Sequence, residues 1–147
     1  MFYTRSSQYA IRALRYLALQ KGEGLSRLEE IAGAEEIPQA FLAKLMQRLV
    51  KRRLIRSLKG MRGGFALNMP ADKITLYMVV DAMDDLSYSG MECAFGNREC
   101  SETESCALHD RWKDLKSRET NFLKEITLAD LVRAAAGRRK AAIAKAL

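Results

Sequence analysis

The 147-residue sequence has one histidine, one tryptophan, two prolines and three cysteines. A single histidine, and no acidic pair in an apolar setting, leave little material for general acid–base catalysis. A phosphate-binding glycine loop of the Walker type is also missing. We therefore expect no enzyme and no small-molecule substrate.

Long hydrophobic runs are also missing. No stretch approaches the roughly 20 apolar residues that cross a bilayer, and residues 1–7 show no apolar region of a secretory signal. We therefore expect a cytoplasmic protein with no membrane partner. Three cysteines cannot all pair in disulfides, and a reducing cytosol would not maintain structural bridges. The cysteines therefore favour metal or redox chemistry.

The charge is unevenly distributed along the chain. Residues 1–70 contain 13 Lys and Arg against 5 Asp and Glu, residues 71–130 contain 7 against 13, and residues 131–147 contain 5 against none. One basic run has no acidic residue between its members: Lys44, Arg48, Lys51, Arg52, Arg53, Arg56, Lys59 and Arg62. A solvated surface usually mixes signs, so the run favours binding to nucleic acid.

Hydrophobic periodicity predicts the fold of residues 1–86. We expect a helix over about 7–20 capped by Ser6 or Ser7, a short helix after a capping box at 26–29, and a third helix from Pro38. Short strands at 54–57 and 65–67 flank a glycine-rich turn, and a fourth helix starts at Pro70 and ends at 84–85. The expected fold is mainly α with a small β wing, a winged helix-turn-helix.

This fold suits double-stranded DNA. A helix about 10–12 Å across enters the major groove, while a basic hairpin reaches the neighbouring backbone or minor groove. A winged helix used only for protein contacts is the alternative, which the positive run disfavours. The candidate DNA-binding residues lie on the third helix and the hairpin: Gln39, Ala40, Lys44, Gln47, Arg48, Lys51, Arg56, Lys59 and Arg62.

An apolar seam follows in residues 108–133, the expected dimerisation helix and a short following segment. Its candidate contact residues recur at helical spacing, interrupted by Glu119: Leu108, Trp112, Leu115 and Phe122. An amphipathic helix of this length usually pairs with its copy, so we expect a homodimer. The alternative is that the seam packs wholly on its own domain. Residues 134–147 form a basic, alanine-rich tail that we expect to be flexible, either frayed or weakly helical.

Every cysteine and the only histidine lie within seventeen residues, at Cys93, Cys100, Cys106 and His109. We assign residues 87–107 as a metal-binding loop, because thiolates and imidazole bind zinc, copper or iron–sulfur centres. Only Cys106 and His109 have the tight spacing of a structural zinc site. The wider cysteine intervals favour an iron–sulfur cluster, with zinc as the alternative.

The chain resembles the Rrf-two family of transcriptional regulators, and within it the IscR-like iron–sulfur cluster regulators. The resemblance spans about residues 1–133, and its most specific parts are the run from Cys106 to Leu115 and Phe122–Leu123. It implies a dimeric DNA-binding repressor or activator of iron–sulfur assembly and stress genes, located on the bacterial nucleoid when bound. It also implies a two-iron, two-sulfur (2Fe–2S) cluster on the three cysteines and His109.

The sequence departs from the family pattern at several positions. Six residues separate Cys93 from Cys100 where the pattern has five, and Arg53 replaces a glycine that ends the third helix. Ala43 stands where IscR-like proteins carry a glutamate that discriminates between DNA sites. Gln8 stands where the family's nitric-oxide sensors place an aspartate ligand, which weakens a four-iron (4Fe–4S) assignment. A cluster-free, thiol-responsive or zinc-stabilised regulator is the remaining alternative.

Overall fold

The structure, a computed structural model, describes residues 3–20, 24–86, 93, 103 and 105–146, with side chains up to residue 137. Cys100 and most of the expected loop at 87–107 lie outside these residues. None of the helices in the described segments combines the length and apolar character needed to cross a membrane.

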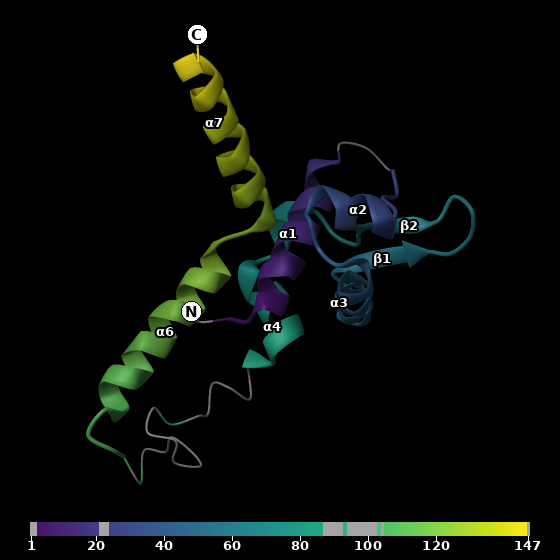
Figure 1. The fold of residues 1–147 in the computed structure, drawn as a ribbon. Helices are drawn as coiled ribbons and strands as arrows, with labels where there is room; N and C mark the ends of the chain where they lie inside the picture. Colours follow the sequence, from purple (N-terminus) through teal and green to yellow (C-terminus); the bar gives the residue numbers. More distant parts are fainter. Residues whose placement is uncertain (1–2, 21–23, 87–92, 94–102, 104, 147) are drawn as a thin grey trace.

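Three helices and a two-stranded hairpin form the body of the protein (Figure 1). They are α1 (Arg5–Leu19), α2 (Leu28–Ala34), α3 (Gln39–Lys51), β1 (Ile55–Leu58) and β2 (Gly64–Leu67). The strands pair antiparallel with Ser57 opposite Phe65. Apolar residues at helical spacing meet in one core, which includes Leu14, Ile31, Leu42, Met46, Leu49 and Leu54. This arrangement confirms the predicted mainly α fold with a β wing.

Helix α1 begins earlier than predicted. Thr4 caps it by accepting from the Ser7 backbone N–H at 3.4 Å, so the expected cap at Ser6 or Ser7 was wrong. Ser7 is fully buried, and its hydroxyl donates to Asp84 Oδ2 at 2.8 Å. The Ser7 hydroxyl therefore bonds to a residue 77 positions away instead of capping the helix.

The start of α2 is also shifted, by one residue. The Arg27 backbone N–H donates to Glu30 Oε2 at 2.9 Å, so Glu30 rather than Glu29 closes the turn. Ser26 pairs with Phe65 of β2 through two backbone hydrogen bonds of 3.0 and 2.8 Å. This isolated antiparallel bridge attaches Ser26 to β2 of the two-stranded wing.

Helix α3 ends in a Schellman motif without glycine. The Arg53 N–H donates to the Val50 carbonyl at 2.9 Å, and the Leu54 N–H to the Leu49 carbonyl at 3.0 Å. Arg53 accordingly adopts a φ of +60°, the left-handed conformation in which glycine is favoured. A side chain here costs about 1 kcal/mol. Leu54, which is 1% exposed, anchors the motif in the core.

The segment after the wing is divided into two elements. A 3₁₀ turn (η1, Ala71–Lys73) precedes α4 (Leu76–Asp84), where one helix from Pro70 was expected. Thr75 accepts from the Met78 N–H at 3.3 Å and starts α4. Ile74 is held extended because its carbonyl accepts from the Leu128 N–H at 2.9 Å.

Two further helices follow in the described residues, α6 (His109–Glu125) and α7 (Leu128–Ala146). Thr127, between them, forms an antiparallel bridge with Thr75. Leu123 of α6 packs with Leu76 and Val80 of α4. Helix α7 runs through residues 134–146, which we expected to form a flexible tail. Figure 1 shows α6 on the opposite side of the body from the wing.

Candidate DNA interface, helical seam and thiol site

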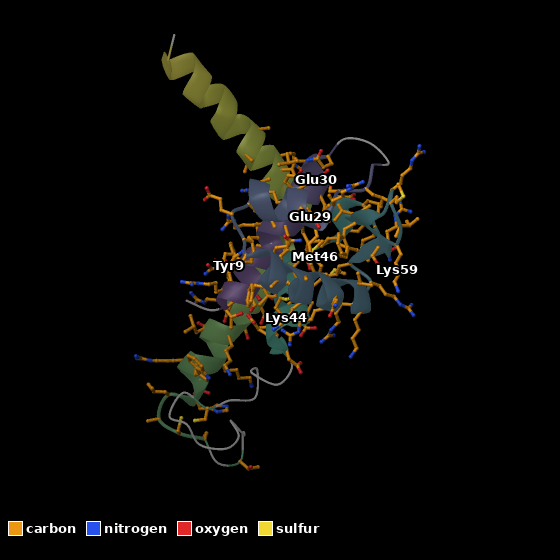
Figure 2. All side chains as sticks on the ribbon, turned by 45° about the vertical axis from the view of Figure 1, so that its right-hand side comes forward. Tyr9, Glu29, Glu30, Lys44, Met46 and Lys59 are labelled. Atoms are coloured by element: carbon orange, nitrogen blue, oxygen red, sulfur yellow. The ribbon has the colours of Figure 1, made fainter. Side chains whose placement is uncertain are left out.

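Helix α3 has one buried and one exposed face. Leu42, Leu45, Met46 and Leu49 are buried in the core, which turns the polar positions of the same helix outward. The exposed positions include all six contacts predicted on this helix: Gln39, Ala40, Lys44, Gln47, Arg48 and Lys51. Figure 2 labels Lys44 on this helix and Lys59 on the wing. The structure therefore presents most of the predicted reading residues to solvent on rigid elements.

Two of the predicted contact residues also make bonds within the protein. Gln39 Nε2 donates to Glu29 Oε1 of α2 at 3.1 Å, which holds this amide at the start of the reading helix. Arg48 Nη1 donates to the carbonyl of Met83 at 3.0 Å. Arg48 thus ties α3 to the last turn of α4, a role that sequence reasoning did not assign to it.

The wing presents its three predicted cations, Arg56, Lys59 and Arg62, as exposed side chains. Its turn requires glycine at a close backbone approach. A Cβ added to Gly63 would lie 2.3 Å from the Leu58 carbonyl oxygen, and Gly60 has a φ of +109°. The turn is therefore sharply folded and conformationally restricted.

Arg27 is a further residue at the wing that sequence reasoning missed. Its Nη2 donates to the Met61 carbonyl at 2.7 Å, across 34 residues of sequence. Arg27, Leu28 and Glu29 face Leu58 and Met61 across a hollow of about 490 Å³. No sequence signal pairs Arg27 with the wing, because the contact is a guanidinium bonded to a backbone carbonyl.

The last turn of α4 joins several parts of the protein. Asp81 Oδ2 lies 3.4 Å from Arg52 Nη1 of the segment that ends α3, and its Oδ1 accepts from the Leu86 N–H at 3.0 Å. Asp84 accepts from the Thr4 backbone N–H at 2.9 Å. The end of α3, the start of α1 and the entry to the cysteine-bearing segment are thus bonded to one helical turn.

Helix α6 exposes part of its predicted seam. Leu108, Leu115 and Phe122 recur every seven residues and are 39%, 41% and 55% exposed. Trp112 is half-buried, with Lys116 Nζ 4.9 Å from its ring centroid. Burial raises the pKa of Glu119, which interrupts the seam, and Lys116 opposes the rise. The apolar seam is thus not wholly covered by its own domain.

The thiols of Cys93 and Cys106 lie together, with their sulfurs 4.0 Å apart and no disulfide between them. Two thiolates on one tetrahedral metal, with bonds of about 2.3 Å, would lie roughly 3.8 Å apart. His109 is 6% exposed at the first turn of α6, and its backbone N–H donates to the Cys106 carbonyl at 3.0 Å.

The structure describes three of the four donors expected from the sequence. Cys93 and Cys106 come together, His109 is buried close to them in sequence, and Cys100 lies outside the described residues. In the part of the chain that the structure describes, no three His, Cys, Asp or Glu side chains converge into a metal site. The observed feature is therefore a thiol pair.

Comparison with known proteins extends these observations. The Rrf2 family, described as iron-dependent transcriptional regulators, matches residues 3–134. The HTH-type transcriptional regulator IscR of Pectobacterium atrosepticum is 36% identical over 129 residues, covering 88% of this chain and 77% of IscR.

Two solved structures share the fold. CymR (YrzC), named as the global cysteine regulator of B. subtilis, superposes with a TM-score of 0.75 at 23% identity, covering 91% of this chain and 98% of CymR. IscR of T. potens superposes with a TM-score of 0.74 at 22% identity, covering 92% and 88%. The regulators that this chain resembles are not enzymes. The winged helix, its exposed basic face and the match over residues 3–134 show that the chain belongs to the Rrf2 family of DNA-binding transcriptional regulators.

Proposed function

We propose that the protein is a homodimeric, sequence-specific repressor whose DNA binding responds to a bound iron–sulfur cluster. The target genes would serve iron–sulfur assembly or the response to iron and redox stress. The observation that carries the proposal is the 4.0 Å separation of the Cys93 and Cys106 sulfurs. Similarity to IscR supports the same class of function.

The donor set fits a 2Fe–2S cluster. Cys93, Cys100, Cys106 and His109 would hold it, supplying three thiolates and one imidazole. The cluster, when bound, supplies a centre that is sensitive to oxidants and to iron supply. Burial of Cys93 and His109, at 8% and 6% exposure, shields these donors from solvent.

For DNA binding, the exposed face of α3 would read the major groove and the wing would contact the adjacent backbone or minor groove. The contact residues remain those inferred from the sequence, with Arg48 and Gln39 held by Met83 and Glu29. Two copies of α3 would engage half-sites separated by about one helical turn of DNA. A duplex operator and a second copy of the chain are therefore the partners.

The exposed seam of α6 would form the dimer contact through Leu108, Trp112, Leu115 and Phe122. His109 begins α6, so the cysteine-bearing segment leads directly into this helix. Binding or loss of the cluster would change the placement of α6, and hence the separation of the two α3 helices in the dimer. DNA affinity or site choice would follow that separation.

The test is an ultraviolet–visible spectrum with iron and sulfide analysis of anaerobically purified protein. About two irons and two sulfides per chain are expected, whereas about four of each would indicate a nitric-oxide-sensing class. Cys100→Ala should abolish the visible absorption, and Ser105→Ala should retain it as a matched control. An unchanged spectrum for Cys100→Ala would remove that cysteine from the ligand set.

A cluster-free regulator that responds through its thiols is the second candidate, favoured by the proximity of the Cys93 and Cys106 sulfurs. Colourless protein after anaerobic reconstitution would support it, provided that DNA affinity changes with a disulfide oxidant and recovers with dithiothreitol. Colourless protein containing one zinc per chain would indicate a structural metal instead.

A further inference from the structure

Met61, at the tip of the wing, is the most exposed of the large hydrophobic side chains in the described segments, at 93%. Leu58, at the base of the same turn, is 55% exposed. An isolated exposed apolar residue is common on protein surfaces. Here, however, the two apolar side chains occur together on the wing, whose exposed cations are candidate DNA contacts.

The backbone under Met61 is held in place. Arg27 Nη2 donates to its carbonyl at 2.7 Å, and the Gly63 N–H donates to the Gly60 carbonyl at 2.9 Å. The Ser26–Phe65 hydrogen bonds join β2, one residue beyond its turn-side end at Gly64, to the segment that precedes α2. The tip of the wing and the adjoining part of β2 are thus attached to the helix-turn-helix unit.

The cations beside Met61 would position it against the backbone of bound DNA. Lys59 and Arg62 flank it along the turn and are exposed, so contacts of these cations with phosphates would place Met61 between them. The minor groove is about 6 Å wide and has sugar walls with apolar faces. An unbranched thioether side chain is narrow enough to enter it, and methionine is among the apolar side chains that contact base steps there.

We propose that Met61 is an apolar DNA contact that enters the minor groove, and that Arg27 is the positioning residue that holds it there. The inference rests on the proposed DNA-binding function and adds two residues to it. Arg27 acts through the Met61 carbonyl, so removing its guanidinium releases the tip while leaving the Met61 side chain intact. Met61 supplies contact area without charge.

Binding of fluorescently labelled duplex DNA, selected by this protein from a random pool, tests the proposal at several salt concentrations. Met61→Ala should weaken binding about tenfold, as expected for the loss of a buried Met side chain. The slope of affinity against salt should stay unchanged, because no phosphate contact is lost. Lys59→Ala should lower the slope by about one unit. Leu19→Ala, at a 45% exposed apolar residue on α1, is the matched control and should bind normally.

A double-mutant cycle tests Arg27. If Arg27 positions Met61, Arg27→Ala and Met61→Ala should be non-additive, with the double variant binding about as weakly as Met61→Ala alone. Met61→Leu should retain most of the affinity. Additive losses would overturn the positioning role, and an unchanged affinity for Met61→Ala would overturn the contact. Failure of the parent protein to select any duplex would instead refute the proposed function.

Discussion

The guanidinium of Arg48 and the carbonyl oxygen of Met83 lie 3.0 Å apart, joining α3 to the last turn of α4. The carbonyls of a helical last turn lack intrahelical partners, and a cation near them is favourable. Arg48 therefore serves the stability of the domain as well as the basic surface. The end of α4 and the reading helix are consequently fixed to one another.

Replacing Arg48 with alanine should reduce the free energy of unfolding by about 1 kcal/mol, because a charged hydrogen bond to a half-buried carbonyl is lost. Denaturant unfolding monitored by circular dichroism measures this loss. Gln47→Ala changes an adjacent exposed position and should unfold like the parent. Equal stabilities for both variants would mean that the Arg48–Met83 bond contributes nothing to the fold.

Arg53, with a φ of +60°, permits a test of backbone strain at the end of α3. Arg53→Gly removes the cost of a left-handed arginine and should stabilise the protein by about 1 kcal/mol. Arg53→Ala removes the same charge but keeps the strained φ, so it should show no such gain. Thermal unfolding of both variants measures the difference. Identical melting temperatures would show that the Schellman turn is not strained at this position.

The seam on α6 predicts the oligomeric state. Leu115→Glu places a charge where the second copy would pack, and should raise the dimer dissociation constant by about 100-fold. Ser117→Glu introduces the same charge at an exposed position on the same helix and should leave the dimer intact. Sedimentation equilibrium distinguishes these outcomes. A Leu115→Glu variant with the parent's mass would show that this face is not the dimer contact.

The stability of the first turn of α7 should depend on pH. Asp130 accepts from the Thr127 N–H at 2.9 Å and from its hydroxyl at 2.7 Å. These bonds, with a bond from Arg133, lower the pKa of Asp130 to about 2. The carboxylate therefore stabilises the fold fully above its unfolded pKa of about 4, and this contribution is lost as the pH falls to about 2.

Asp130→Asn tests this pH dependence, since the amide oxygen can still accept a hydrogen bond but does not titrate in this range. Its far-ultraviolet circular dichroism should change less than the parent's between about pH 4 and pH 2. Asp114→Asn, an exposed position in α6, is the control and should behave like the parent. Matching acid transitions for parent and Asp130→Asn would contradict the role of this carboxylate.

Local patterns were sufficient to predict the winged helix and its exposed basic face. Apolar spacing placed Leu42, Met46 and Leu49 in the core, because burial of one helical face is encoded in consecutive turns. Contacts between distant residues were not predictable in this way. Glu35 is 8% exposed and lies 3.1 Å from Arg12 and 3.3 Å from Arg15 of α1, which no local motif indicates.

In the candidate sites, too, residue types were predictable and contacts between distant residues were not. The sequence identified the cysteines and the cationic side chains, because ligand and charge types are visible in single residues. It did not reveal that Arg27 holds the Met61 carbonyl, or that Ser26 joins the wing. The caps predicted for α1 and α2 were also wrong. Ser7 donates its hydroxyl hydrogen bond to Asp84, and the backbone of Ser26 is hydrogen-bonded to Phe65.

The bridge between Thr75 and Thr127 has a mechanical consequence. The Leu76 N–H donates to the Ile126 carbonyl and the Leu128 N–H to the Ile74 carbonyl, both at 2.9 Å. The C-terminal end of α6 is therefore a fulcrum, a fixed point about which the helix can rotate. The helix has 17 residues and therefore extends about 25 Å from this point. A rotation of about 10° at the fulcrum would move its far end, beside Cys106, by about 4 Å over that length. Small angular changes at the junction thus correspond to displacements at the thiol site that are as large as the separation of its two sulfurs.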